Sequence, residues 1–513
     1  MKKQAYNPYL PLDEYVPDAE PHVFDGRVYV YGSHDKEDGE TFCMLDYVCY
    51  SAAVDDLRTW RNEGVIYRAS QDPDYGKKDS IYSPVVREYL YAPDVVRGND
   101  GKYYLYYCLS GKFGQGGYHG PIRVAVCDTP AGEYQYLGFV RHTDGSPMRD
   151  GVCFDPAVIN DEGIIRLYYG TQYLSEEEED FLTDEDAIKE EMDMFNKSRE
   201  EIVTHAAGVS VMGAYSVILE NDMLTVKEKA HPVIPYKVKG TSFEGHSFFE
   251  GSSIRKVGKK YYFVYSSCLN HELCYAVSDY PDYGYEYGGT IVSNGDVGFN
   301  GRTGSERLNM TGTTHGGIEK IGDQWYVFYH RLTHKSDYSR QGCAEPIEIL
   351  PDGKIRQVEV SSCGLNGEPL AAEGKYPAAI CCVLTNGHMP HGSNHKFTEH
   401  FPHIGSGDGM RYVAELQDGT LIGYRYFDFT GAGFFSVTAK CEQDAVIEVY
   451  QGLPEGYISV NEIAAECIAE IKMPASGEWI SCGAEVPFAK GKYPLYLVYR
   501  GKGEGKMLEI SFS

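Results

Sequence analysis

The stretch FDGRVYVYGS, residues 24–33, joins a tight turn at Gly26 to a strand of alternating aromatic and aliphatic residues, which predicts a β-hairpin. Similar stretches turn at Gly101 (NDGKYYLYYC), Gly163 (DEGIIRLYYG), Gly258 (KVGKKYYFVYSS) and Gly322 (KIGDQWYVFYH), at intervals of 75, 62, 95 and 64 residues. A single hairpin of this kind would favour an irregular sandwich. Because repeated units usually mean repeated architecture, the five copies predict an all-β fold, a five-bladed β-propeller, over residues 1–364.

The longest interval contains an insertion. Residues 175–203, SEEEEDFLTDEDAIKEEMDMFNKSREEIV, are acidic and free of Gly and Pro. Their apolar residues recur at helical spacing, at Phe181, Ile188, Met192 and Phe195. We therefore predict a helical insertion at 175–203.

The repeat is absent after about residue 365. We expect residues 365–395 to form a linker and residues 396–513 to form a β-sandwich of the jelly-roll type, because short alternating runs there are separated by Gly and Asp. Trp479 falls at the start of one predicted strand, where packing in the core is the favoured role.

Composition excludes several classes of function. The 47 basic and 75 acidic residues give a net charge of −28, which repels nucleic acid and anionic membranes. No stretch approaches the ~20 apolar residues of a membrane span. The 14 cysteines lack regular spacing and predict buried reduced thiols, and Asp, Glu and Pro interrupt the N-terminal region where an export signal needs an apolar run. We expect a cytoplasmic protein.

A polar side chain precedes each turn glycine by seven or eight residues: Asp18, Asp94, Asp155, Glu250 and His315. Equivalent positions on the innermost strands of a propeller converge on one axial pocket. An isolated Asp at such a place is usually a turn residue. Several carboxylates in one cavity raise the proton affinity of at least one, a cost rarely kept without a use. Two acids, one protonated and one ionised, suffice for glycoside hydrolysis.

The motifs PDAEPHVF, YAPDVV, FDPAVI, FFEGSSIRK and GTTHGG resemble glycoside hydrolase family 43, five-bladed propeller enzymes that include β-xylosidases, α-L-arabinofuranosidases and arabinanases. The resemblance covers the first two thirds of the chain. It implies that Asp18 is the general base, Glu250 the general acid, and Asp155 the residue that tunes and orients Glu250. It also implies inversion at the anomeric carbon, which requires roughly 6.5 to 9.5 Å between the Asp18 and Glu250 carboxyl groups.

The same resemblance suggests substrate contacts at Asp94 and at Arg340 in YSRQGCAEPI, for which a turn residue and a solvated or paired arginine are the alternatives. His22 and His246, each four residues from a predicted catalytic acid, are further candidate substrate contacts. His315 matches an axial histidine that in many relatives helps to hold a central calcium ion, largely through waters. Calcium prefers oxygen ligands, so a channel histidine without a metal is the alternative.

The C-terminal stretches IGYRYFDF and GEWISCGAEVPFAKGKYPLYLVYRG resemble the family 6 carbohydrate-binding β-sandwich. We therefore expect an inverting exo-acting hydrolase that releases terminal α-L-arabinofuranose, with β-D-xylose as a second sugar, from arabinoxylan- or arabinan-derived oligosaccharides. The alternatives are an endo-arabinanase and a propeller that binds sugar without cleaving it. An invertase-like fructosidase is disfavoured, because its usual NDPNG sequence is absent. Pentose-containing oligosaccharides are the expected partners.

Overall fold

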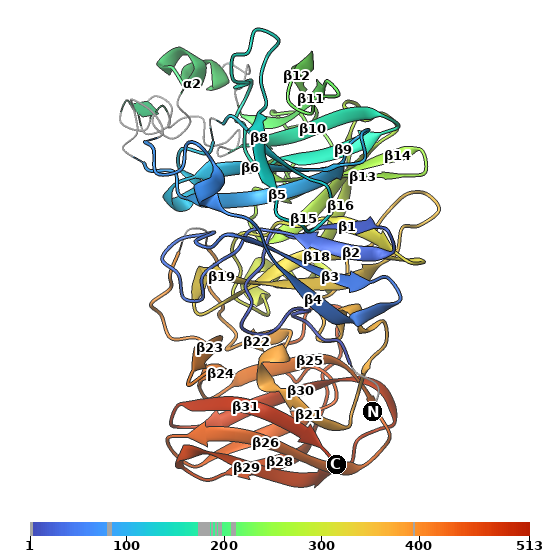
Figure 1. The fold of residues 1–513 in the computed structure, drawn as a ribbon. Coiled ribbons are helices and arrows are strands. Elements are labelled where there is room, and N and C mark those ends of the chain that lie inside the picture. The colour runs from blue at the N-terminus through green and yellow to red at the C-terminus, as the bar shows by residue number, and fades with distance from the viewer. Residues whose placement is uncertain are drawn as a thin grey trace.

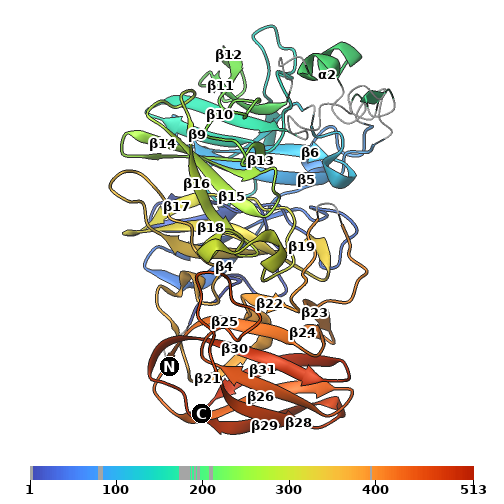
Figure 2. The ribbon, with the colours of Figure 1, turned by 180° about the vertical axis from the view of Figure 1, so that it is seen from behind.

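The computed structural model describes residues 4–78, 85–118, 120–172, 185, 188–189, 192, 197–206, 212–392 and 395–513. Its regular structure is almost entirely β-sheet, which confirms the predicted all-β class. Figures 1 and 2 show five sheets built from residues 20–347 in the upper part, here called the five-sheet unit, and two sheets built from residues 370–512 below them, here called the C-terminal unit. No helix among these residues is long and apolar enough to cross a bilayer.

Five β-hairpins turn at the five glycines of the sequence repeat. Their φ angles are 78°, 86°, 93°, 62° and 62°, in the left-handed region that glycine enters without a Cβ clash. Each hairpin joins the first strand of a sheet to the second: β1 (Glu20–Phe24) to β2 (Arg27–Tyr31), β5 (Tyr89–Arg97) to β6 (Tyr103–Ser110), β9 (Ala157–Asp161) to β10 (Ile164–Thr171), β13 (Phe248–Val257) to β14 (Lys260–Ser267), and β17 (Ile318–Ile321) to β18 (Gln324–Thr333).

The remaining strands of the five sheets follow in chain order on the outer side of each hairpin. They are β3 (Tyr47–Ala53) and β4 (Asp56–Tyr67), β7 (Arg123–Cys127) and β8 (Gln135–Phe139), β11 (Gly213–Leu219) and β12 (Val226–Pro232), β15 (Glu272–Ser278) and β16 (Glu286–Ser293), and β19 (Ser336–Ile347). Short 3-10 turns lie between strands: η1 (Ala69–Gln71), η2 (Lys112–Gly114), η4 (Phe299–Gly301) and η5 (Gly304–Glu306).

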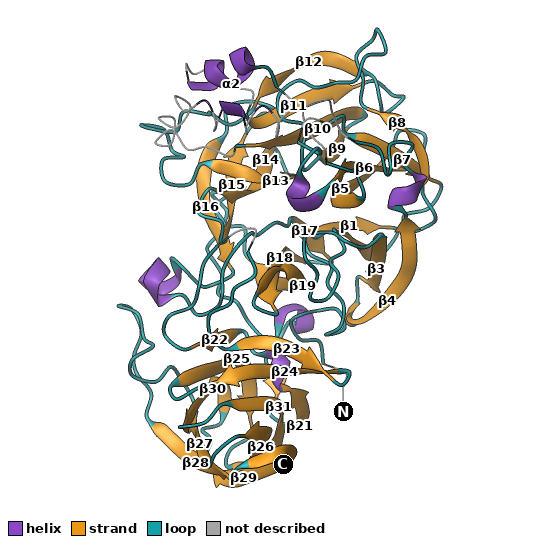
Figure 3. Cartoon of the chain, turned by 90° about the vertical axis from the view of Figure 1, so that its left-hand side faces the viewer, coloured by secondary structure: helices purple, strands orange, loops and turns teal. Residues whose placement is uncertain are grey.

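The five sheets contact one another in cyclic order. β1 contacts β5, β5 contacts β9, β9 contacts β13, β13 contacts β17, and β17 contacts β1. Each sheet also shares an apolar core with the next, and the fifth shares one with the first, where Val28 and Val30 join Phe328 and Ala344. The first strands of all five sheets therefore lie around a common centre, seen from another side in Figure 3.

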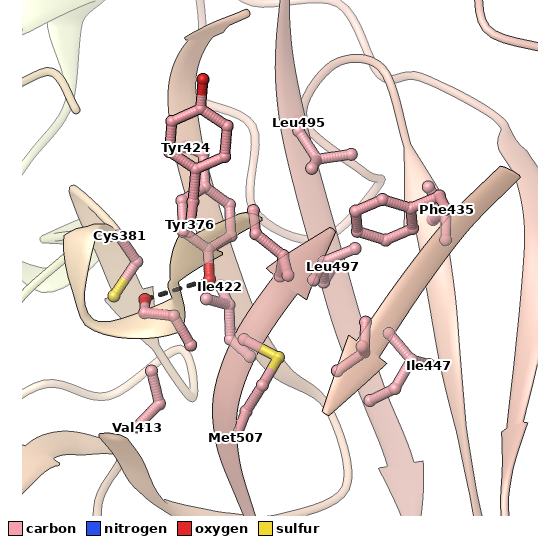
Figure 4. Close-up of a cluster of buried hydrophobic side chains, with 14 of the residues drawn as sticks. Tyr376, Cys381, Val413, Ile422, Tyr424, Phe435, Ile447, Leu495, Leu497 and Met507 are labelled. Carbon is pink, nitrogen blue, oxygen red and sulfur yellow. Dashed lines mark hydrogen bonds between the residues drawn. The ribbon is translucent and has the colours of Figure 1, made fainter. Parts of the chain in front are cut away.

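The C-terminal unit consists of two six-stranded sheets. One contains β20 (Leu370–Ala371), β22 (Val383–Thr385), β25 (Thr420–Phe429), β27 (Ala445–Tyr450), β28 (Cys467–Met473) and β30 (Gly491–Gly501). The other contains β21 (Gly374–Pro377), β23 (His403–Gly407), β24 (Met410–Leu416), β26 (Gly433–Cys441), β29 (Ser476–Val486) and β31 (Gly505–Phe512). Side chains of both sheets fill one apolar core, in which Phe435, Leu497 and Met507 lie together (Figure 4).

Three strands fall inside the expected linker at 365–395. β20 and β22 pair with β25, and β21 pairs with β31, so residues 370–385 belong to the C-terminal sheets. The turn η6 (Gly364–Asn366) precedes β20, and the turn η7 (Ala378–Ile380) lies between β21 and β22. Mixed polarity along this segment suggested a connector, but these strands are only two to four residues long, too short to show an alternating pattern.

Two further expectations concern local features. Trp479 lies outside the C-terminal core: it is half-buried in β29, with its ring 5.6 Å from that of Tyr412 and the Lys440 ammonium 4.9 Å above it.

Most of the predicted helical insertion at 175–203, including Phe181 and Phe195, lies outside the described residues. Within the insertion, Ile188 and Met192 are helical and Ile188 is buried, and the helix α2 spans Arg199–Ala206.

Candidate active site

Three carboxylates line one cavity at the centre of the five-sheet unit. Asp18 lies just before β1, Asp155 just before β9, and Glu250 inside β13. His315 and Arg340 line the same cavity. The ladder between β13 and β14 shifts register on both sides of Glu250, so the strand is irregular where this side chain enters. Five of the residues singled out in the sequence thus come together.

The backbone at two of these acids is strained. Asp18 has φ 56° and Asp155 has φ 45°, in the left-handed region that residues with a Cβ seldom adopt. Both residues are 4% exposed. Aspartate is among the residues that tolerate this conformation best, and observed strain of this kind concentrates at functional sites. The two residues therefore combine buried charge with an unfavourable backbone.

Asp18 is held ionised by a buried arginine. Burial alone would raise the pKa of Asp18. The guanidinium of Arg340, whose Nη1 donates to Asp18 Oδ1 at 2.7 Å, is the largest of the opposing influences, and together with His315, His330 and Ser33 it lowers the pKa below the usual value. His330 places Nδ1 3.5 Å from the same oxygen and donates from Nε2 to the Thr313 carbonyl at 2.8 Å. Ionised at neutral pH, Asp18 can accept a proton.

Asp155 and Glu250 form a pair with the opposite tendency. Burial raises the pKa of both groups, and nearby negative charge raises it further: Glu250 and Asp18 act on Asp155, and Asp18 acts on Glu250. Asp155 Oδ2 accepts a hydrogen bond from the Gly251 amide at 3.1 Å, which ties it to the residue after Glu250. The pair therefore holds a proton at neutral pH, which one member can donate.

Arg340 is fixed by a second carboxylate and by an aromatic ring. Its Nε and Nη2 donate to the two oxygens of Asp35 at 2.8 and 3.0 Å, a two-pronged contact that sets the plane of the guanidinium. The guanidinium carbon lies 4.7 Å from the centre of the Phe42 ring. This arginine is thus paired, which was one of the alternatives for it, and it also borders the cavity. Its contact with substrate stays a prediction.

His315 lies between the acids. Its Nδ1 is 3.8 Å from Asp155 Oδ2 and 4.0 Å from Asp18 Oδ1, and burial lowers its pKa. Gly251, with φ 74°, makes room for the ring, because a Cβ there would stand 3.1 Å from ring atoms of His315. Among the described residues, His315 Nε2 has no hydrogen-bond partner. It is therefore open to a further ligand.

Two buried oxygen atoms near His315 are also available to a ligand. Glu20 Oε1 and Ser253 Oγ belong to side chains that interact with each other, and within the described part of the chain neither atom has a further hydrogen-bond partner; the charge of Glu20 also acts on His315. Both oxygens lie 2.7 Å from the point where a Cβ on Gly317 would stand, so they face the same narrow space. Carboxylate and hydroxyl oxygens beside one imidazole are a donor set that suits calcium.

Asp94 and His22 are not brought to the cavity lining. His22 Nε2 lies 2.6 Å from Asp94 Oδ1, and Asp94 Oδ2 accepts a hydrogen bond from the Val158 amide at 2.6 Å. Burial raises the pKa of Asp94 to about 7 and lowers that of His22 to about 4, so the imidazole is uncharged near neutral pH and the carboxyl group holds a proton part of the time. The pair joins β1, β5 and β9, which is a structural task.

His246 also stands apart from the cavity lining. Its Nδ1 lies 2.7 Å from Glu272 Oε1, and its ring stacks on Tyr287 at 4.6 Å. The imidazole, Ser267 and Thr290 all contact the Glu272 carboxylate, and the pKa of that group falls to about 2 because these contacts outweigh its burial. Of the four predicted substrate contacts, only Arg340 lines the cavity.

Sequence reasoning missed the aromatic walls of the cavity and two of its polar supports, Asp35 and His330. Phe154 and Phe249 directly precede Asp155 and Glu250, a shared Phe-acid step that was available as a signal. The other aromatic residues stand in loops or in β5 and carry no common pattern. The aromatic lining consists of Phe42, Tyr91, Phe113, Tyr118, Phe154 and Phe249.

Comparisons with known proteins bear on the same region. The model of one protein family, Glycosyl hydrolases family 43, matches residues 17–355. A xylosidase/arabinosidase from Thermoclostridium stercorarium is 41% identical over 523 residues, spanning 99% of this chain and 98% of that protein. An arabinoxylan arabinofuranohydrolase from Paenibacillus polymyxa is 25% identical over 544 residues, spanning 98% of this chain and 73% of the relative.

Solved structures include a similar fold. The crystal structure of the GH43_1 enzyme from Xanthomonas citri complexed with xylose matches with a TM-score of 0.51 and 24% sequence identity. The match covers 70% of this chain and 94% of that one. At this identity the likeness shows a shared fold.

Proposed function

This chain belongs to family 43 of the glycosyl hydrolases, and we propose that it is an inverting, exo-acting enzyme that releases terminal α-L-arabinofuranose, and also β-D-xylose, from oligosaccharides derived from arabinoxylan or arabinan. That it is a glycoside hydrolase follows from the family and from 41% identity to a xylosidase/arabinosidase over the whole chain. The choice of sugar is supported by the names of that relative and of the arabinofuranohydrolase.

The observation that carries the mechanism is the opposite protonation tendency of the carboxylates in one cavity. Asp18, with its pKa lowered beside Arg340, is the general base that takes a proton from water as the water attacks the anomeric carbon. Glu250, with its pKa raised, is the general acid that protonates the leaving oxygen. Asp155 raises the proton affinity of the site and orients Glu250 through the Gly251 amide. A single displacement of this kind inverts the configuration.

Exo action is supported by the aromatic lining. Six aromatic side chains wall the cavity around the acids, which suits one terminal sugar ring better than an internal segment of a long chain. An endo-arabinanase needs a groove that is open at both ends. The net charge of −28 fits a neutral oligosaccharide as partner.

We propose further that the five sheets close into a five-bladed β-propeller within residues 1–364 and that the C-terminal unit is a jelly-roll β-sandwich related to family 6 carbohydrate-binding modules. The cyclic order of strand contacts and the core shared by the first and fifth sheets support the propeller. The core between two six-stranded sheets supports the sandwich, whose first strand begins at Leu370. Fourteen free thiols support a reducing, cytoplasmic location.

A calcium ion on the propeller axis completes the proposal. His315 Nε2, Glu20 Oε1 and Ser253 Oγ would hold it, directly or through water. His315 Nε2 is buried without a hydrogen-bond partner among the described residues, and the two oxygens face one space beside Gly317. A divalent cation there would add positive charge near Asp18 and favour the ionised form that a general base needs.

The test is hydrolysis of 4-nitrophenyl α-L-arabinofuranoside and β-D-xyloside, and of arabinoxylo-oligosaccharides, with the anomer first released followed by NMR. We expect free pentose of inverted configuration from the non-reducing end. Asp18→Asn should lose most turnover on all of these substrates and Glu250→Gln should lose most turnover on the oligosaccharides, while both variants keep the fold. A protein that only binds sugar would show no turnover in the wild type, and product of retained configuration would contradict the assigned roles.

A further inference from the structure

The loop at 32–46, between β2 and β3, supplies one edge of the active site. It carries Asp35, which grips Arg340 with both oxygens, and Phe42, which lies against the same guanidinium and lines the cavity. Asp35 Oδ1 also accepts a hydrogen bond from the Cys43 amide, so the two ends of the loop are tied together. The position of this loop therefore sets the position of Arg340, and through it the geometry at Asp18.

The outer side of the loop is held from the C-terminal unit at Glu37. Arg411 in β24 donates from Nη2 to Glu37 Oε2 at 2.6 Å, and Ser406 in β23 hydrogen-bonds to the same carboxylate. From the five-sheet unit, the Tyr15 hydroxyl donates to Oε1 at 2.8 Å and His334 Nε2 lies 3.4 Å from it. Glu37 thus collects contacts from both units.

The ion pair between Arg411 and Glu37 is partly shielded from solvent. The Arg411 side chain is 13% exposed and that of Glu37 is 31% exposed, so solvent screens the pair less than it would a surface pair. A second contact runs parallel to it, because Lys396 Nζ donates to the Asp38 carbonyl at 3.2 Å. The C-terminal unit therefore touches two adjacent residues of the loop that fixes Arg340.

We propose that the C-terminal unit positions the catalytic base: Arg411 holds Glu37, Glu37 holds the loop at 32–46, and the loop holds Arg340 against Asp18. Arg411 and Glu37 are positioning residues in this chain of contacts, since neither lines the cavity. The inference rests on the proposed function, in which Asp18 activates water. It gives the C-terminal unit a part in turnover that requires no sugar binding of its own.

The molecule offers a matched control. Arg302, in the segment between β16 and β17, donates from Nη2 to Glu462 of the C-terminal unit at 2.5 Å. The two side chains are 2% and 13% exposed, so this pair joins the same two units and is at least as buried as the first. Neither residue lines the cavity or contacts the loop at 32–46 in any recorded hydrogen bond or ion pair of the described residues. A substitution in this pair therefore shows the effect of weakening the contact between the two units without changing the contacts of the loop.

The experiment compares Arg411→Met, Arg411→Lys, Glu37→Gln and Glu462→Gln by steady-state kinetics on the aryl pentosides and by thermal unfolding. Arg411→Met and Glu37→Gln should lower kcat roughly tenfold, less than the ~10²-fold that a displacement of ~1 Å can cost, with KM changed by less than about twofold. Arg411→Lys should recover most of kcat. Glu462→Gln should lower the unfolding temperature without lowering kcat.

Hydrogen exchange of the peptide that covers residues 32–46 provides a readout independent of turnover. We expect faster exchange in Arg411→Met and unchanged exchange in Glu462→Gln. If Arg411→Met matches Glu462→Gln in both kcat and exchange, the positioning role is wrong. If the wild type cleaves none of the pentosides, the proposed function fails, and the exchange comparison still decides whether the C-terminal unit holds the loop.

Discussion

Replacing Arg340 with methionine should move the acidic limb of the pH–rate profile to higher pH. Arg340 is the cation that offsets the burial of Asp18, and it does so through a charged hydrogen bond of 2.7 Å. Such bonds contribute about 1.5–3 kcal/mol, and one pKa unit corresponds to about 1.4 kcal/mol. Removing this contact should therefore raise the pKa of Asp18 by roughly one to two units.

The direction of the shift follows from which form is needed. The general base must be ionised, so activity is lost as pH falls through its pKa. In the wild type this pKa lies below the usual value for aspartate, and the stability that the ionised form contributes is lost only when pH falls through that lowered pKa. In Arg340→Met the pKa rises, so both activity and this stability are lost at a higher pH.

The assay is kcat/KM as a function of pH, which reports the groups of the free enzyme, together with thermal unfolding. Removing one partner from a buried ion pair costs about 3–5 kcal/mol, so the variant will be less stable and needs a control of equal burial. Arg123 is a suitable control. Its side chain is 2% exposed and pairs with Asp72 and Asp74 at 2.9 and 3.0 Å, and it does not line the cavity. Arg123→Met should lose stability and keep the acidic limb in place. An unmoved limb in folded Arg340→Met, or an equal shift in Arg123→Met, would refute the reasoning.

Three further outcomes are expected. Glu250→Ala should lose more than about 10²-fold in kcat on natural oligosaccharides and much less on 4-nitrophenyl glycosides, because nitrophenolate leaves without a proton; equal losses on both, measured by steady-state kinetics, would count against a general acid. Asp155→Asn removes one carboxylate of the coupled pair and should move the alkaline limb of the kcat profile to lower pH; an upward shift would contradict this. EDTA should lower the unfolding temperature of the wild type, read by calorimetry, and leave that of His315→Ala unchanged; no effect on the wild type would argue against the axial cation.

The hairpins could be predicted because their signal is local. A glycine with a left-handed φ between two alternating strands needs no tertiary information, and all five were found. The acids could be predicted because each stands at a fixed distance from its hairpin. Asp35 and His330 could not, because Asp35 meets Arg340 across 305 residues and no spacing in the sequence links them.

Asp94 shows that a similar distance in sequence from the turn glycine does not bring every side chain into the cavity. Asp18, Asp155 and Glu250 stand eight residues before their turn glycines, whereas Asp94 stands seven before Gly101. Successive side chains of a strand point to opposite faces, so a difference of one residue changes the face. The ladder of β5 also shifts register between Tyr91 and Asp94. The carboxylate consequently pairs with His22. His315 also stands seven residues before its turn glycine and lines the cavity, so the spacing alone could not set Asp94 apart.

The three acids that line the cavity stand at irregular points of the backbone. Asp18 and Asp155 adopt left-handed φ angles that cost of order 1–3 kcal/mol each, and Glu250 lies between two register shifts of β13. Two of these irregularities stand just before a strand and the third lies inside one, and all three side chains line the same cavity. If the three side chains pointed in different directions, each backbone irregularity would need its own explanation. Because they converge on one space where burial also opposes their ionisation, the strain and the electrostatic cost have one common explanation, a site shaped for proton transfer rather than for stability.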